Sequence, residues 1–88
     1  MAYYKIEFSA SARAKFSAID KPVQRAIQKY FNRAALHLNP RAFGKPLQYT
    51  LYGLWRYRVG DYRIIVSIQD NKLIILVIDI DHRQKIYD

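Results

Sequence analysis

The first quarter of the chain predicts a strand followed by a short helix. Residues 3–8 alternate apolar and polar side chains, which is typical of a half-buried strand. Apolar side chains then recur at helical spacing over residues 10–18, and Ser9 or Ser11 can cap the helix that begins there. The stretch Asp20-Lys21-Pro22 ends this helix and begins another, because proline is tolerated only in the first turn of a helix.

The second predicted helix is longer and amphipathic. Its apolar positions follow a 3.6-residue period, and they are Val23, Ile27, Tyr30, Phe31, Ala34 and Leu38. Cations recur every four residues on another face, at Lys21, Arg25, Lys29 and Arg33. Such a stripe is usually only solvated, and binding of nucleic acid is the alternative. Asn39-Pro40 ends the helix.

The second half of the chain predicts a loop and then three strands. Residues 41–48 contain glycine and proline and are expected to form the loop. Residues 49–59 and 62–68 are predicted to form the arms of a hairpin, joined by the two-residue turn Gly60-Asp61. Residues 73–80 are an almost unbroken apolar run, which is typical of a strand buried on both faces.

The order of these elements predicts a single α+β domain over residues 1–88. The order is β-α-α-β-β-β. We expect two N-terminal helices packed on one face of a twisted, mainly antiparallel four-stranded sheet.

Composition adds a strong positive charge to this picture. The 88 residues include 15 Lys and Arg against 7 Asp and Glu, a net charge of +8, which suits nucleic acid or an acidic protein partner. There is no cysteine, so a disulfide framework and a thiolate metal site are excluded. No apolar run approaches the ~20 residues of a membrane-spanning helix, and the N-terminus lacks the pattern of a signal peptide. We therefore expect a cytoplasmic protein with no membrane partner.

The predicted hairpin gathers three arginines on one face. In its register Arg58 lies opposite Arg63, and Arg56 lies opposite Ile65. The aromatic and aliphatic residues between them take the other face, because side chains alternate along a strand. Like charges that lie directly opposite each other oppose folding, and no carboxylate is expected among these three. A bound polyanion explains this arrangement best.

The end of the chain is predicted to return to the same place. With a two-residue turn at Asp70-Asn71, Arg63 lies level with Ile78, so residues 81–88 leave the last strand beside the three arginines. This segment contributes the further chemical groups of His82, Arg83, Lys85 and Tyr87. We expect these groups to converge with the hairpin arginines at one end of the sheet.

Such a cluster suits the cleavage of a phosphodiester in RNA. Guanidinium groups match phosphate oxygens and stabilise charge that develops at phosphorus. RNA supplies its own nucleophile, the 2′-hydroxyl, so we expect neither a metal nor another cofactor. His82, Lys85 or Tyr87 can move protons, and Tyr87 can instead stack on a base. A metal site is not expected, because Asp79, Asp81 and His82 alternate between the faces of a strand and cannot converge.

At these residues the chain resembles the RelE/ParE superfamily of toxin–antitoxin toxins. The resemblance rests on Gly44-Lys45-Pro46-Leu47, on residues 53–63 with their Gly-Asp-Tyr-Arg turn, and on His82-Arg83 followed by Tyr87. It covers nearly the whole chain, and the ending points to the RelE branch. It implies an endoribonuclease toxin that cuts messenger RNA in the ribosomal A site through 2′-hydroxyl attack. It also implies a cognate RelB-like antitoxin as partner, and operator DNA reached through that antitoxin is a further candidate.

Position by position, the resemblance implies roles for individual residues. Arg56 and Arg58 match the two strand cations, Arg63 the phosphate-stabilising arginine, and Arg83 and Tyr87 the arginine and tyrosine near the C-terminus. The prototype has lysines at the two strand positions, and arginine is a poor general base, so these arginines are expected to act as electrostatic clamps. His82 or Lys85 would then move protons. Lys45 and Lys85 are expected to bind RNA.

Two other functions stay open. A ParE-like poison of DNA gyrase would share the fold, although such toxins generally lack the complete arginine, histidine and tyrosine set. A non-enzymatic RNA-binding module would use Tyr49, Tyr52, Trp55 and Tyr57 between cations. The hairpin pattern places Trp55 and Tyr57 toward the helices instead, as part of the core.

Overall fold

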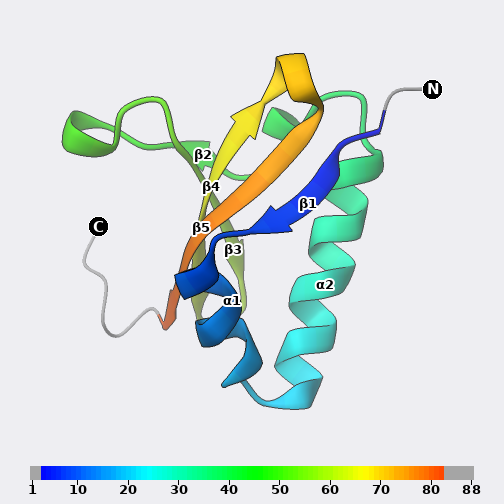
Figure 1. Cartoon of the computed structure of the whole chain (residues 1–88), viewed down its shortest axis with the longest axis vertical. Coiled ribbons are helices and arrows are strands. Elements are labelled where there is room, and N and C mark those ends of the chain that lie inside the picture. Colours follow the sequence, from blue (N-terminus) through cyan, green and yellow to red (C-terminus); the bar gives the residue numbers. More distant parts are fainter. Residues whose placement is uncertain (1–2, 83–88) are drawn as a thin grey trace.

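Within residues 3–82, which the computed structural model describes, five strands form one sheet and helix α2 packs across one of its faces (Figure 1). The elements are β1 (Lys5–Phe8), α1 (Ala10–Ser17), α2 (Lys21–Leu36), β2 (Lys45–Pro46), β3 (Trp55–Val59), β4 (Tyr62–Gln69) and β5 (Ile74–His82). The strand order is β1-β5-β4-β3-β2, with β1 parallel to β5 and the other neighbours antiparallel. The predicted α+β class is confirmed, and the sheet has one short strand more than expected.

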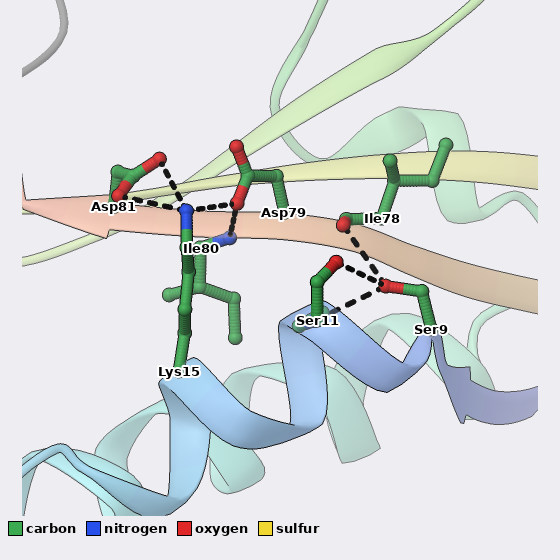
Figure 2. Close-up of polar contacts among 8 residues, drawn as sticks. Ser9, Ser11, Lys15, Ile78, Asp79, Ile80 and Asp81 are labelled. Atoms are coloured by element: carbon green, nitrogen blue, oxygen red, sulfur yellow. Dashed lines mark hydrogen bonds and ion pairs between the residues drawn. The ribbon is translucent and has the colours of Figure 1, made fainter.

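Ser9 joins helix α1 to the edge of strand β5. Its Oγ accepts a hydrogen bond from the backbone N–H of Ala12 at 3.1 Å and donates one to the carbonyl of Ile78 at 3.0 Å (Figure 2). Its backbone N–H donates to the carbonyl of Val77 at 2.9 Å. Ser9 is therefore the N-cap of α1, and the alternative cap, Ser11, lies inside the helix. Because β1 ends just before Ser9, α1 continues along the edge of β5 that β1 leaves free.

The apolar stripe of α2 supplies much of the core. Ile27, Phe31 and Ala34 are fully buried, and Val23 and Tyr30 are packed against them. The cations at positions 21, 25, 29 and 33 are exposed on the outer side of the helix. None of the helices in residues 3–82 is long and apolar enough to cross a membrane.

Helix α2 ends at Leu36, two residues earlier than predicted, and the prediction of Leu38 as a core residue is wrong. The side chain of Leu38 is 82% exposed. The backbone of His37 is already extended, and its Nδ1 accepts a hydrogen bond from the backbone N–H of Asn39 at 2.9 Å. Pro40 disfavours the helical conformation in the residue before it, so the chain leaves the helix before it reaches the proline.

Tyr57 of strand β3 lies in the middle of the core. Its ring is fully buried with its centroid 5.2 Å from that of Tyr30, and its hydroxyl donates to the carbonyl of Pro40 at 2.9 Å. Burial raises the pKa of this phenol. Trp55 packs against the same core, and its indole N–H donates to the carbonyl of Phe43 at 2.6 Å. The prediction that Trp55 and Tyr57 face the helices is therefore confirmed.

Two stretches between α2 and β3 differ from the prediction. Strand β3 begins at Trp55 and not at residue 49, because residues 49–51 form a 3-10 turn that starts with Tyr49 at φ 57°. Residues 45 and 46, which were expected in a loop, pair with β3 as strand β2. The alternation of side chains over residues 49–52 resembles a strand, but alternation alone does not specify the backbone of an exposed turn.

Gly44 allows the chain to pass close to strand β3. Its φ is +72°, and a Cβ atom there would lie 2.1 Å from the carbonyl oxygen of Arg56 and 2.8 Å from Cδ1 of Tyr57. Gly44→Ala therefore adds overpacking to backbone strain. Gly53 has φ +96° with nothing within 4 Å of its Cβ position, so Gly53→Ala is a matched control that adds strain alone.

We expect Gly44→Ala to lower the free energy of unfolding by roughly 1–3 kcal/mol more than Gly53→Ala does. Urea denaturation of the two variants measures this difference. Equal losses of stability would show that the close approach of Gly44 to β3 does not matter for the fold.

Candidate functional site

Strands β3 and β4 place three arginines on the face of the sheet that points away from α2. Arg58 pairs directly with Arg63, and Arg56 lies two residues before Arg58 on the same strand. Tyr57, between the two strand arginines, is buried on the opposite face. Gly60, at φ +57°, makes the two-residue turn that sets this register. The predicted turn, pairing and shared face of the arginines are confirmed.

A fourth cation lies beside Arg56 at the edge of the sheet. Lys45 of β2 pairs with Arg56, and together with Arg58 these side chains line an open groove of about 300 Å³. Gly44 and Tyr30 complete its lining. Burial raises the pKa of the Tyr30 phenol, so the phenol is neutral at physiological pH. We call this the cationic groove (Tyr30, Gly44, Lys45, Arg56, Arg58). The role of Lys45 in binding RNA stays a prediction.

Two carboxylates lie on the same face, and they correct the predicted register of β5. Asp81 pairs with Arg63, at the level where Ile78 was expected. Residues 70–73 separate the two strands in place of a two-residue turn, and a bulge in β4 shifts the register once more. Asp79 lies two residues before Asp81 and also points to this face. The expectation that no carboxylate lies among the arginines is therefore wrong.

Lys15 of helix α1 binds both carboxylates (Figure 2). Its Nζ lies 2.8 Å from Oδ1 of Asp79 and 3.2 Å from Oδ2 of Asp81, and these hydrogen bonds raise the pKa of Lys15. At Asp79, burial acts to raise the pKa of the carboxyl group. The hydrogen bonds around it, chiefly the one from Lys15, outweigh burial and hold that pKa below its ordinary value. Lys15 of α1 thus neutralises part of the negative charge on this face.

His82 lies on the other face of the sheet. It pairs with Tyr62, and the two rings meet edge to face with centroids 5.2 Å apart. Both rings line a groove of about 450 Å³ that extends to Val23 near the start of α2. The structure therefore does not bring His82 to the same face as Arg56, Arg58 and Arg63. Its catalytic role stays a prediction.

Three of the predicted site residues lie outside the described part of the chain. They are Arg83, Lys85 and Tyr87. Their predicted convergence with the arginines of the hairpin stays a prediction. Within residues 3–82, no group of three or more His, Asp or Glu side chains is arranged to hold a metal ion.

Sequence reasoning missed two residues that border the arginines, Lys15 and Tyr30. The spacing of Asp79 and Asp81 was the available signal for Lys15. Two carboxylates at i and i+2 of a strand share a face and repel each other, and a cation between them offsets this repulsion. No comparable signal marked Tyr30. It belongs to the core stripe of α2 by its spacing, and only the fold shows that it also reaches the cationic groove.

The chain matches the family model described as the ParE toxin of the type II toxin–antitoxin system parDE, over residues 6–87. It is 30% identical over 84 residues to toxin RelG of Mycobacterium tuberculosis, which covers 96% of this chain and 95% of that protein. Toxin RelE of the same organism is also 30% identical over 84 residues, covering 96% of this chain and 86% of that protein.

Solved structures share the fold. A chain of the toxin–antitoxin complex RelBE2 from Mycobacterium tuberculosis superposes with a TM-score of 0.83 at 27% identity, over 94% of each chain. The archaeal RelE–RelB complex from Pyrococcus horikoshii OT3 gives 0.77 at 23% identity, over 98% of this chain and 100% of that chain. The isolated RelE toxin of E. coli gives 0.74 at 17% identity, over 92% and 84%.

The lowered pKa of Asp79 makes stability depend on pH. A carboxyl group whose pKa is lower in the folded state stabilises the fold above its unfolded pKa of about 4, and this contribution is lost as the pH falls through the folded pKa. We expect the free energy of unfolding to fall less between pH 6 and pH 3 in Asp79→Asn than in the wild type. Urea denaturation at both pH values measures this, with Asp61→Asn in the hairpin turn as the charge-matched control. The same fall in wild type and Asp79→Asn would show that Lys15 does not stabilise the ionised carboxylate.

Proposed function

Because this chain belongs to the RelE/ParE superfamily of type II toxin–antitoxin toxins, we propose that it is an endoribonuclease that cuts messenger RNA on the ribosome and so inhibits translation. The two curated relatives of 30% identity are both toxins with RelE-type names, which supports the RelE branch. Translation takes place in the cytoplasm, so this function also places the toxin there.

The pairing of Arg58 with Arg63 is the observation that carries this proposal. Together with Arg56 and Lys45, the pair concentrates four cations on two neighbouring strand pairs. Guanidinium groups present a fixed fork of N–H donors that matches two oxygens of a phosphate. The backbone of an RNA strand supplies phosphates in series, so one can lie at the Arg58–Arg63 pair while a neighbour lies in the cationic groove.

The chemical step follows from these groups and from RNA itself. The 2′-hydroxyl attacks the adjacent phosphorus, the bond from phosphorus to the 5′-oxygen breaks, and a 2′,3′-cyclic phosphate remains. Negative charge grows on the phosphate oxygens as this happens, and fixed donors stabilise it more in the transition state than in the ground state. Arg63 is the residue we assign to this stabilisation, with Arg56, Arg58 and Arg83 holding the strand.

Two protons move in this reaction, one from the 2′-hydroxyl and one to the leaving 5′-oxygen. The arginines are poor candidates, because their guanidinium groups do not lose a proton in proteins. His82 faces away from Arg58 and Arg63, which favours Lys85 or Tyr87 for at least one of the transfers. Because the cut is made in the ribosome, a group of the ribosome can carry out the other proton transfer.

We expect Arg63→Ala to cut A-site messenger RNA roughly 10²–10³-fold more slowly than the wild type, because one well-placed donor to the transition state is lost. Single-turnover cleavage on programmed ribosomes measures the rate, and circular dichroism checks that the variant is folded. Lys72→Ala is the matched control, because it removes one positive charge from the turn before β5, away from the arginines. Cleavage by Arg63→Ala at the wild-type rate would remove Arg63 from the site.

A ParE-like poison of DNA gyrase is the second candidate, because the matching family model is that of the ParE toxin. Brief expression in cells separates the two functions. We expect cut transcripts with ends at A-site codons and no DNA-damage response. A DNA-damage response with intact transcripts would establish the ParE-like function and refute the nuclease.

A cognate RelB-like antitoxin is the expected protein partner. Five of the similar structures are complexes of a RelE-type toxin with a RelB-type antitoxin or a peptide of it, and the net charge of +8 suits an acidic binding segment. Operator DNA would then be reached through the antitoxin. We expect the product of the neighbouring reading frame to co-purify with this chain and to restore growth when both are expressed. Failure of the two proteins to co-purify would contradict this pairing.

A further inference from the structure

The loop between β2 and β3 carries two tyrosines that are almost fully exposed. Tyr49 is 90% and Tyr52 is 85% exposed, and the loop projects from the edge of the sheet away from α2 (Figure 1). The loop is closed by backbone hydrogen bonds from Leu47 to the carbonyl of Leu54 at 3.0 Å and from Tyr52 to the carbonyl of Tyr49 at 3.0 Å. These large aromatic rings thus stand on an internally bonded loop, and folding gains little from them because they are not buried.

Tyr52 forms part of the lining of a groove. Tyr52 lines an open groove of about 300 Å³ with Trp55 and Arg41, and Pro46, Leu47, Gly53 and Leu54 complete the lining. We call this the aromatic groove. Tyr49 lies outside its lining. The two tyrosines therefore share exposure and loop but differ in their surroundings.

Two walls of the aromatic groove are held in place by hydrogen bonds. The indole N–H of Trp55 donates to the carbonyl of Phe43 at 2.6 Å. The guanidinium of Arg41 donates to Oδ1 of Asp70 at 3.0 Å and to the carbonyl of Ile68 at 3.3 Å. The groove is thus lined by two aromatic side chains and an arginine, which are the types of side chain on which proteins stack single-stranded bases.

The aromatic groove adjoins the cationic groove. The pair Lys45–Arg56 lines the cationic groove, and the next pair along the same two strands, Pro46–Trp55, lines the aromatic groove. Successive side chains point to opposite faces of a strand, so Lys45 and Arg56 point to the outer face, and Pro46 and Trp55 point to the face that α2 covers. The two grooves therefore flank the edge of the sheet at β2. A nucleotide joins a phosphate to a flat aromatic base, and an RNA strand that crosses this edge meets the matching chemistry on its two sides.

We infer that the aromatic groove binds a nucleobase of the RNA strand whose phosphate lies in the cationic groove, with the base stacked on Tyr52. This inference rests on the proposed function, because the strand in the cationic groove is the messenger RNA of that proposal. Stacking accepts all four bases, so the groove positions the strand and does not read its sequence. Tyr52 is a positioning residue that holds the RNA in line for cleavage at Arg63.

The test is a cycle of protein and RNA changes. The probe is a short single-stranded oligonucleotide with the bases of RNA and 2′-deoxyribose at every position. In parallel probes, one base at a time is also removed to leave an abasic site. The deoxyribose prevents cleavage, so equilibrium binding is measured at low ionic strength by fluorescence anisotropy. The proteins are the wild type, Tyr52→Ala, Tyr52→Phe and, as the matched control, Tyr49→Ala.

We expect Tyr52→Ala to weaken binding roughly tenfold to a hundredfold, while Tyr52→Phe, which keeps the ring, and Tyr49→Ala bind as the wild type does. Removing the base at one position should weaken binding to the wild type by a similar factor. The same abasic probe should bind Tyr52→Ala as tightly as the intact probe does. Wild-type affinity in Tyr52→Ala, or equal losses at the abasic site in both proteins, would overturn the inference, as would undetectable binding of the wild type.

Cleavage on programmed ribosomes separates this inference from the function on which it rests. If the wild type cuts A-site messenger RNA and Tyr52→Ala leaves both binding and KM unchanged, the aromatic groove is refuted and the nuclease stands. If the wild type does not cut, but the cycle shows that Tyr52 and one base depend on each other, the nuclease is refuted and the base-binding groove stands.

Discussion

Burial of Tyr57 under α2 determines which face of the sheet carries the arginines. A slip of one residue in a strand exchanges its two faces, so register is strongly specified where one face is buried. Here the ring of Tyr57 packs on Tyr30 and its hydroxyl bonds to Pro40, and a slip of one residue would expose the ring and break this hydrogen bond. Arg56 and Arg58, on either side of Tyr57, therefore have only the outer face to occupy. The core in this way defines the site.

The face of the sheet that carries the arginines also carries two carboxylates. Asp79 and Asp81 stand on the strand next to Arg63, where they would weaken the attraction of the arginines for a phosphate. Lys15 binds both carboxylates from the side of α1, at 2.8 Å and 3.2 Å. An anchor made by Ser9, which caps α1 and bonds to the carbonyl of Ile78, holds Lys15 at this edge. The way that α1 is attached thus places a cation beside the two carboxylates that neighbour Arg63.

Much of this arrangement was predictable from the sequence, and the errors have physical causes. The Gly60-Asp61 turn fixes its own register locally, so the pairing of Arg58 with Arg63 follows from a few neighbouring residues. The turn after β4 has no such signature, and a bulge inside β4 adds a second shift that no alternation pattern reveals. For that reason Asp81 stands where Ile78 was expected.

His82 and residues 49–52 show the same limit. Counting residues placed His82 at the correct end of the sheet, but the shifted register determines its face, and it meets Tyr62 there instead of the arginines. Residues 49–52 alternate like a strand, yet their backbone forms a 3-10 turn that starts with Tyr49 at positive φ. The contribution of Lys15 depends on how a helix meets a sheet, which is a property of the fold and not of any local pattern.

The central claim is that Arg56, Arg58 and Arg63 act as one phosphate-binding surface. The most direct test follows the Nε–Hε resonances of arginine by NMR while a 2′-deoxy oligonucleotide, which cannot be cleaved, is added. We predict that the signals of these three arginines shift together and fit one dissociation constant, while the signal of Arg13 on α1 stays in place. Shifts that fit unrelated constants, or that are as large at Arg13 as at Arg63, would contradict the claim.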